Sequence, residues 1–149
     1  MNPGVDADPA QAGRTDVRQP HGCDVLIADD AGASRELLTA ILRNLEGRMS
    51  IEAARDGHEA VALWLALRPR VTLLDIDMPG LDGLTVLEQL RSVDGEAFVA
   101  IVSGSNSIDN VKRALSLGAA GFVIKPYKPQ RIVDLLQRYH ERSGHNLMS

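Results

Sequence analysis

The sequence has little cysteine and few aromatic residues, and each shortage excludes a class of protein. The single cysteine, Cys23, excludes an intramolecular disulfide and any paired-cysteine metal or redox site, which favours a reducing compartment. One Trp, two Tyr and two Phe are too few for an aromatic platform that stacks nucleic-acid bases. The longest apolar run, Ala60 to Leu67, is far shorter than the ~20 residues that a membrane helix needs.

The net charge and the length of the chain exclude further classes of protein. The 16 Lys and Arg against 20 Asp and Glu give a net charge of −4, which disfavours a nucleic-acid partner held by bulk electrostatics. The N-terminus also lacks the charged and then apolar layout of a secretory signal. A length of 149 residues with 44% hydrophobic residues is typical of one globular domain. We therefore expect one cytoplasmic domain with no membrane segment.

Three segments are distinguished by composition. Residues 1–22 contain Pro and Gly without any apolar period, so we predict a disordered leader there. Residues 23–142 alternate short apolar runs with longer stretches of helical period, and residues 143–149 are predicted to form a flexible tail. Alternation of this kind is typical of βαβ units on a parallel sheet.

Five strands and five helices are predicted in the domain. The predicted strands are Val25–Asp29, Met49–Ala53, Val71–Asp75, Phe98–Ser103 and Gly121–Ile124. Apolar stripes predict the helices between and after them, for example around Leu37 to Leu45, around Ile108 to Leu115 and around Ile132 to Tyr139. With right-handed crossovers this gives an α/β fold, a flavodoxin-like (βα)5 doubly wound parallel sheet of strand order 2-1-3-4-5.

Polar residues stand where the predicted strands end. Asp29 ends the first strand and Asp30 follows it, Asp75 ends the third, Ser103 ends the fourth and Lys125 follows the fifth. The ligand crevice of a doubly wound sheet lies at these carboxyl ends, so we expect the five residues to converge. Crowded carboxylates require a cation, and Mg²⁺ prefers such oxygen ligands. A metal on one side and Lys125 on the other would hold a phosphoryl group.

The motifs LIADD, LLDIDMPGLDG, AIVSGS and GFVIKP, in this order, resemble those of the receiver domain of two-component response regulators. The resemblance covers Asp24 to Arg142. It implies an Asp75 phosphoacceptor that takes its phosphoryl group from a phosphohistidine of a sensor histidine kinase or phosphotransfer protein. It also implies that the domain catalyses only its own phosphotransfer and dephosphorylation. The output would be control of a downstream partner protein.

The resemblance also assigns a role to each position of the site. Asp29, Asp30 and Asp75 would bind Mg²⁺ through side chains, and Asp77 through its main-chain carbonyl. Ser103 would follow the phosphoryl group, Lys125 would pair with it, and Phe122 would change rotamer. Ser103 and Phe122 would thereby switch a surface made by the fourth helix, the fifth strand and the fifth helix.

Two more features follow from the resemblance. The Lys125–Pro126 peptide is predicted to be cis. Asp77 and Ser105 stand at positions that vary in the family and are expected to tune the hydrolysis of the aspartyl phosphate. We expect a long-lived phosphoryl group here, because Ser105 is short and the charge of Asp77 repels phosphoryl oxygens.

Three alternatives remain open from the sequence. A haloacid-dehalogenase-type phosphatase would use Asp75 as nucleophile and Asp77 as general acid. In that family a second acidic pair follows the nucleophile in the chain, whereas Asp29 and Asp30 precede Asp75. A Ca²⁺ loop starting at Asp75 would have Val86 where the bidentate ligand belongs. A receiver fold that signals without phosphate would be a pure interaction module. For the receiver domain itself we expect a monomer, with neither a nucleic acid nor a membrane as partner.

Overall fold

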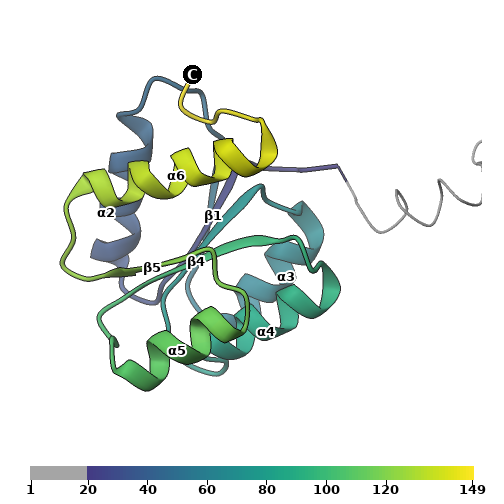
Figure 1. The fold of residues 1–149 in the computed structure, drawn as a ribbon, viewed down its shortest axis with the longest axis vertical. Helices are drawn as coiled ribbons and strands as arrows, with labels where there is room; N and C mark the ends of the chain where they lie inside the picture. Colours follow the sequence, from purple (N-terminus) through teal and green to yellow (C-terminus); the bar gives the residue numbers. More distant parts are fainter. Residues whose placement is uncertain (1–19) are drawn as a thin grey trace, which may run out of the picture.

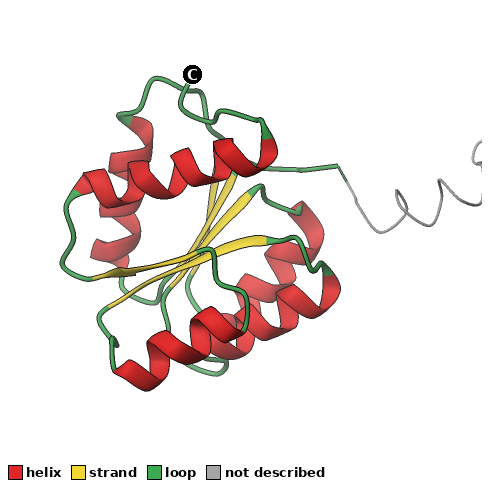
Figure 2. Cartoon of the chain, viewed as in Figure 1, coloured by secondary structure: helices red, strands yellow, loops and turns green. Residues whose placement is uncertain are grey.

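A computed structural model describes residues 20–149, which form a five-stranded parallel sheet between two layers of helices (Figure 2). The strand order is β2-β1-β3-β4-β5, as predicted from the sequence. The strands are β1 (Val25–Ala28), β2 (Ile51–Ala54), β3 (Val71–Leu74), β4 (Phe98–Ser103) and β5 (Gly121–Ile124). Four of the five strands match the prediction to within one residue, and β2 begins two residues later than predicted.

Helices cover both faces of the sheet. They are α2 (Gly32–Arg43), α3 (Gly57–Leu67), α4 (Gly83–Val93), α5 (Ile108–Ser116) and α6 (Pro129–Ser143). Figure 1 shows α2 and α6 on one side of the sheet and α3, α4 and α5 on the other. This distribution is the doubly wound arrangement, in which the helices change sides where the strand order reverses, between β1 and β3.

The core is divided into two hydrophobic clusters by the sheet. Side chains alternate along β1, so that Val25 and Ile27 join the cluster under α2 and α6, while Leu26 joins the cluster under α3, α4 and α5. Trp64 lies in this second cluster, which also receives the half-buried Phe122. Because both faces are covered, β1 and β3 are buried at every position.

Local signals in the sequence fix where helices begin. The side chains of Asp56, Asp82 and Ser107 accept hydrogen bonds from backbone N–H groups in the first turns of α3, α4 and α5. Pro129 opens α6, where its missing N–H costs nothing. The helix ends at Gly144, whose φ of 76° lies in the left-handed region.

The structure corrects part of the predicted helical stripes. Ile108 and Leu115, predicted to mark a buried face, are 72% and 55% exposed, and Leu37 is also exposed. In α5 only Ala114 is buried, because the small side chain faces the second cluster and the larger ones point away from the sheet. The apolar period therefore identified the helix but not its buried side.

The two ends of the domain are both attached to it. The leader predicted for residues 1–22 lies mainly outside the described residues, but His21 Nδ1 donates to Arg68 O at 2.7 Å and Gly22 N to Leu67 O at 2.5 Å. At the other end, Leu147 is buried under α2 and α6. The sequence predicts a flexible tail at residues 143–149 because most of these residues are polar. The contact of Leu147 with the core depends on a single apolar side chain, which forms no pattern. Within residues 20–149, no helix is long and apolar enough to cross a membrane.

Candidate phosphoacceptor site

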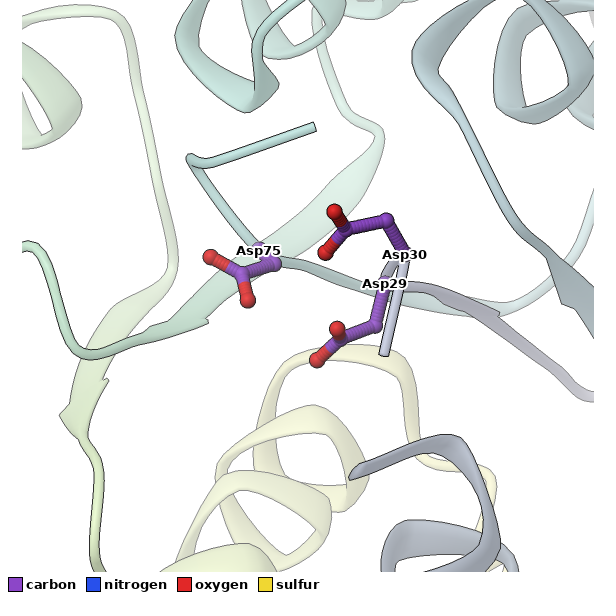
Figure 3. Close-up of side chains that lie close together, drawn as sticks. All are labelled: Asp29, Asp30 and Asp75. Atoms are coloured by element: carbon purple, nitrogen blue, oxygen red, sulfur yellow. The ribbon is translucent and has the colours of Figure 1, made fainter. Parts of the chain in front are cut away.

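Two buried carboxylates lie side by side at the carboxyl edge of the sheet. Asp29 follows β1 and Asp75 follows β3, and these strands are neighbours in which Ala28 pairs with Leu74. Asp29 is 1% and Asp75 is 6% exposed, whereas Asp30 is exposed at the rim. The three side chains have carboxylate oxygens within 4.8 Å of one another (Figure 3). The predicted convergence of the three aspartates is therefore present.

Lys125 lies against the two buried carboxylates. It follows β5, and its Nζ donates to Asp29 Oδ2 at 2.6 Å and to Asp75 Oδ2 at 2.8 Å. Its side chain is only 24% exposed, so the two ion pairs are poorly screened by water. The Lys125–Pro126 peptide is cis, as predicted.

The Asp75 carboxylate is held at both oxygens. Ser103 Oγ, fully buried at the end of β4, donates to Asp75 Oδ1 at 2.6 Å, and Asp77 N donates to the same oxygen at 3.0 Å. Lys125 holds the other oxygen. Three donors from three different loops thus fix the position of one carboxylate, which is a preorganised arrangement for chemistry at Asp75.

Burial and hydrogen bonding act in opposite directions on the charges of the site. Burial raises the pKa of Asp29, but hydrogen bonds from Lys125, Ser34 and Ala31 N outweigh it and hold the pKa below its usual value. Burial lowers the pKa of Lys125, but its bonds to Asp29 and Asp75 outweigh burial and raise it. Lys125 and Asp29 are therefore both charged at neutral pH.

The donor set fits Mg²⁺. Carboxylate oxygens are hard ligands, and two buried aspartates with one exposed one leave a side open to water, which Mg²⁺ retains when it binds. Lys125 supplies one positive charge against three negative ones, so the cluster retains a net negative charge. Asp29, Asp30 and Asp75 are the side chains that would hold the ion.

A glycine is required beside Asp75. A Cβ on Gly83, at the start of α4, would lie 2.0 Å from Asp75 O and 2.9 Å from Ile76 Cα. The backbone N of Gly83 donates to Ile76 O at 2.8 Å, which closes the loop after β3. The missing side chain of Gly83 therefore lets α4 pack directly on the Asp75 backbone.

The remaining predicted residues lie at the mouth of the site or behind it. Asp77 is exposed, and its Oδ2 accepts a hydrogen bond from Ser105 Oγ. Ser105 N donates to Ser103 Oγ at 3.2 Å, so the loop after β4 is tied to the site twice. Phe122 packs half-buried against the cluster under α3, α4 and α5.

Sequence reasoning missed one group that positions Asp29. Arg35 Nη1 donates to the backbone carbonyl of Asp29 at 2.8 Å. The sequence contains a signal for this bond, because Arg35 lies in the first turns of α2, six residues after Asp29, but a single arginine on a helix is usually a solvated charge. Arg35 thus fixes the backbone from which the Asp29 side chain projects.

Family and sequence comparisons agree on one group of proteins. The family model of the response regulator receiver domain matches residues 25–137. The chemotaxis protein CheY of Thermotoga maritima is 32% identical over 117 residues, covering 78% of this chain and 97% of that protein. The probable C4-dicarboxylate response regulator DctR of Priestia megaterium is 33% identical over 115 residues, but the chain spans only 50% of its length.

Solved structures give the same result. The receiver domain of NtrX from Brucella abortus has a TM-score of 0.73 and 34% identity, covering 80% of this chain and 100% of that one. The CheX-CheY-BeF3-Mg complex from Borrelia burgdorferi contains a chain that matches with a TM-score of 0.72 and 32% identity, covering 85% and 92%. Both similarities extend over nearly the whole described domain.

Proposed function

Since the chain belongs to the response regulator receiver domains, a family of signalling domains, we propose that Asp75 accepts a phosphoryl group from a phosphohistidine. The donor is a sensor histidine kinase or a phosphotransfer protein. The observation that carries the proposal is the Asp75 carboxylate, bound at one oxygen by Ser103 and Asp77 N and at the other by Lys125. An Asp75 oxygen attacks phosphorus, and the P–N bond of the donor breaks.

The surrounding residues stabilise the charge that develops during transfer. Lys125 exchanges its bond to Asp75 Oδ2 for one to a phosphoryl oxygen, and Ser103 does the same from Oδ1. Asp29, Asp30, Asp75 and the carbonyl of Asp77 would hold Mg²⁺, which would supply positive charge to neutralise the phosphoryl oxygens. Neither Lys125 nor Ser103 needs to travel far, because both already contact the acceptor.

The same hydrogen bonds connect phosphorylation to the surface. When Ser103 moves toward the phosphoryl group, the loop after β4 follows, since Ser105 N is bonded to Ser103 Oγ. Phe122 then changes rotamer and fills the space that is left. Ile108, Leu115 and Ile124 are exposed on α5 and β5, and with α6 they form the surface that controls a downstream effector protein. We place this relay in the cytoplasm, with the domain acting as a monomer and without a nucleic-acid partner.

Mass spectrometry after treatment with acetyl phosphate and Mg²⁺ tests the proposal. The wild-type protein should gain one phosphate, Asp75→Asn should gain none, and the exposed α5 residue in Asp109→Asn should label like wild type. Equal labelling of the wild-type protein and Asp75→Asn would contradict the role of Asp75. A wild-type protein that gains no phosphate would instead favour an interaction module that signals without phosphorylation.

A further inference from the structure

A cavity of about 630 Å³ lies at the edge of the sheet opposite the aspartates. Its lining includes Pro69 and Arg70, just before β3, and Ala97, just before β4, whereas Asp75 follows β3. The C-terminal ends of α3, α4 and α6 complete the wall. A cavity of this size is within the range of small-molecule sites, and the phosphoacceptor chemistry does not use it.

The charge of the cavity is positive. Four arginines line it, against the carboxylates of Asp94 and Glu96, and they are Arg68, Arg70, Arg91 and Arg142. Two of the four have partners, because Arg70 Nε lies 3.3 Å from Asp24 Oδ1 and Arg91 Nη1 donates to Ala97 O at 3.1 Å. The other two, Arg68 and Arg142, have no carboxylate partner within residues 20–149.

Each of these two guanidinium groups is stacked on an aromatic ring. The Arg68 guanidinium carbon is 4.6 Å from the Trp64 ring centroid, and that of Arg142 is 5.5 Å from the Phe98 centroid. Stacking orients the plane of a guanidinium and leaves its edge N–H groups available to donate. Arg68 Nε is buried without a hydrogen-bond partner, so one donor inside the protein is unsatisfied.

The floor between the arginines is apolar and rigid. Phe98 packs edge-to-face on Tyr139 with ring centroids 5.3 Å apart, and both residues line the cavity with Trp64. Trp64, Phe98 and Tyr139 are all buried. An oxyanion would be recognised by the guanidinium edges, and an attached organic group of matching size would lie against this floor.

We propose that this cavity is a binding site for an organic phosphate of about mononucleotide size. Arg68 and Arg142 bind the phosphate through their free N–H groups, and the aromatic floor contacts the organic part. Helix C-termini alone would attract cations rather than anions, so the excess of arginine reverses the local field. The site is independent of the Asp75 chemistry, because it lies at the opposite ends of the strands.

Titration with adenosine monophosphate (AMP) and with inorganic phosphate tests the proposal in buffer containing EDTA. Trp64, the only tryptophan of the chain, reports occupancy through its fluorescence, and calorimetry gives Kd. Without a divalent cation the aspartate cluster repels anions, so it does not compete. AMP should bind saturably and more tightly than phosphate. Arg142→Gln and Arg68→Gln should each weaken AMP binding at least tenfold.

The matched control is Arg131→Gln, an exposed arginine in the first turn of α6 that does not line the cavity. It should bind AMP like the wild-type protein. Thermal melts check that each variant is folded, and Arg142, being exposed, can be replaced without disturbing the core. Absence of saturable AMP binding, equal loss in Arg131→Gln and Arg142→Gln, or tighter binding of phosphate than of AMP would each overturn the proposal.

Discussion

The Ser105 hydroxyl donates a hydrogen bond to the Asp77 carboxylate, and this bond joins the loop after β3 to the loop after β4. Asp77 N donates to Asp75 Oδ1 and Ser105 N to Ser103 Oγ, so the two residues are also tied to Asp75 and Ser103 through their backbones. Asp77 and Ser105 therefore act as a pair at the mouth of the site. A change at one residue alters the hydrogen bonding of the other.

The pair gives a prediction about the lifetime of the phosphoryl group. The double replacement keeps the net charge but moves it. Asp77→Asn removes the carboxylate two residues after Asp75, and Ser105→Glu supplies a longer acid that can hold the attacking water. Dephosphorylation should become about tenfold faster, or about 1.4 kcal/mol lower in barrier. The loss of phosphate after donor removal measures the rate. A double variant that decays no faster than wild type would show that these side chains do not set the lifetime.

A second prediction concerns the switch between Ser103 and Phe122. Adding beryllofluoride with Mg²⁺, a mimic of the phosphoryl group, should change NMR chemical shifts beyond the site, at Lys112, Phe122 and Tyr127. The reason is that Ser103 Oγ is bonded both to Asp75 and to Ser105 N, so a displacement of Ser103 would also displace the loop after β4. Ser103→Ala provides the comparison, since it lacks the hydroxyl that connects acceptor and loop. Shift changes limited to the aspartates and their neighbours would contradict the relay.

A third prediction tests the close approach of α4 to the acceptor. Gly83→Ala should destabilise the protein by about 3 kcal/mol, because its Cβ meets the Asp75 carbonyl at 2.0 Å and backbone atoms cannot move aside easily. Gly95→Ala is the matched control, since a Cβ there meets nothing within 4 Å. Urea unfolding compares the two. Similar stabilities for both variants would mean that the loop relaxes without cost.

A fourth prediction follows from Cys23. Burial first, and then the carboxylates of Glu52 and Asp24, raise the pKa of this thiol from 9.0 to about 11. Below pH 9 the thiol is neutral in both states and its contribution to stability is complete. Between pH 9 and 11 the Cys23 thiol ionises in the unfolded chain but stays mostly neutral in the folded protein, so the free energy of unfolding falls as pH rises.

Urea unfolding at pH 8 and at pH 10.5 measures this effect. The wild-type protein should lose more stability between the two pH values than Cys23→Ala, which has no thiol to ionise. The other titrating groups are the same in both proteins, so the difference between the two losses isolates Cys23. Identical losses would show that the folded thiol titrates like an exposed one.

The sequence was sufficient for the parts of the fold that depend on local patterns. Helices cover both faces of β1 and β3, so their apolar runs stand out in the sequence, and the aspartates that end these runs, Asp29 and Asp75, could be placed by residue number. Ile108 and Leu115 could not be placed, because a helical period gives two or three compatible faces. The buried residue of α5 is Ala114, and this depends on how the helix packs against the sheet.

The sequence also predicts which residues meet at the site, but not all of the contacts between them. Strand ends meet by topology, which brought Asp75, Ser103 and Lys125 together. The contact of Arg35 with the Asp29 carbonyl and the bond between Ser105 and Asp77 depend on side-chain conformation. A pattern of residue types contains no information on such rotamers, so these contacts required coordinates.

Because the sheet separates the two hydrophobic clusters, substitutions in one cluster should affect stability independently of substitutions in the other. Leu42 and Leu136 pack under α2 and α6, while Leu87 and Leu90 pack on the other face, and the clusters share no side chain. Substitutions on opposite faces should therefore add in their effects on stability, to within about 0.5 kcal/mol. The side chains beneath α3, α4 and α5 can therefore be repacked without compensating substitutions beneath α2 and α6.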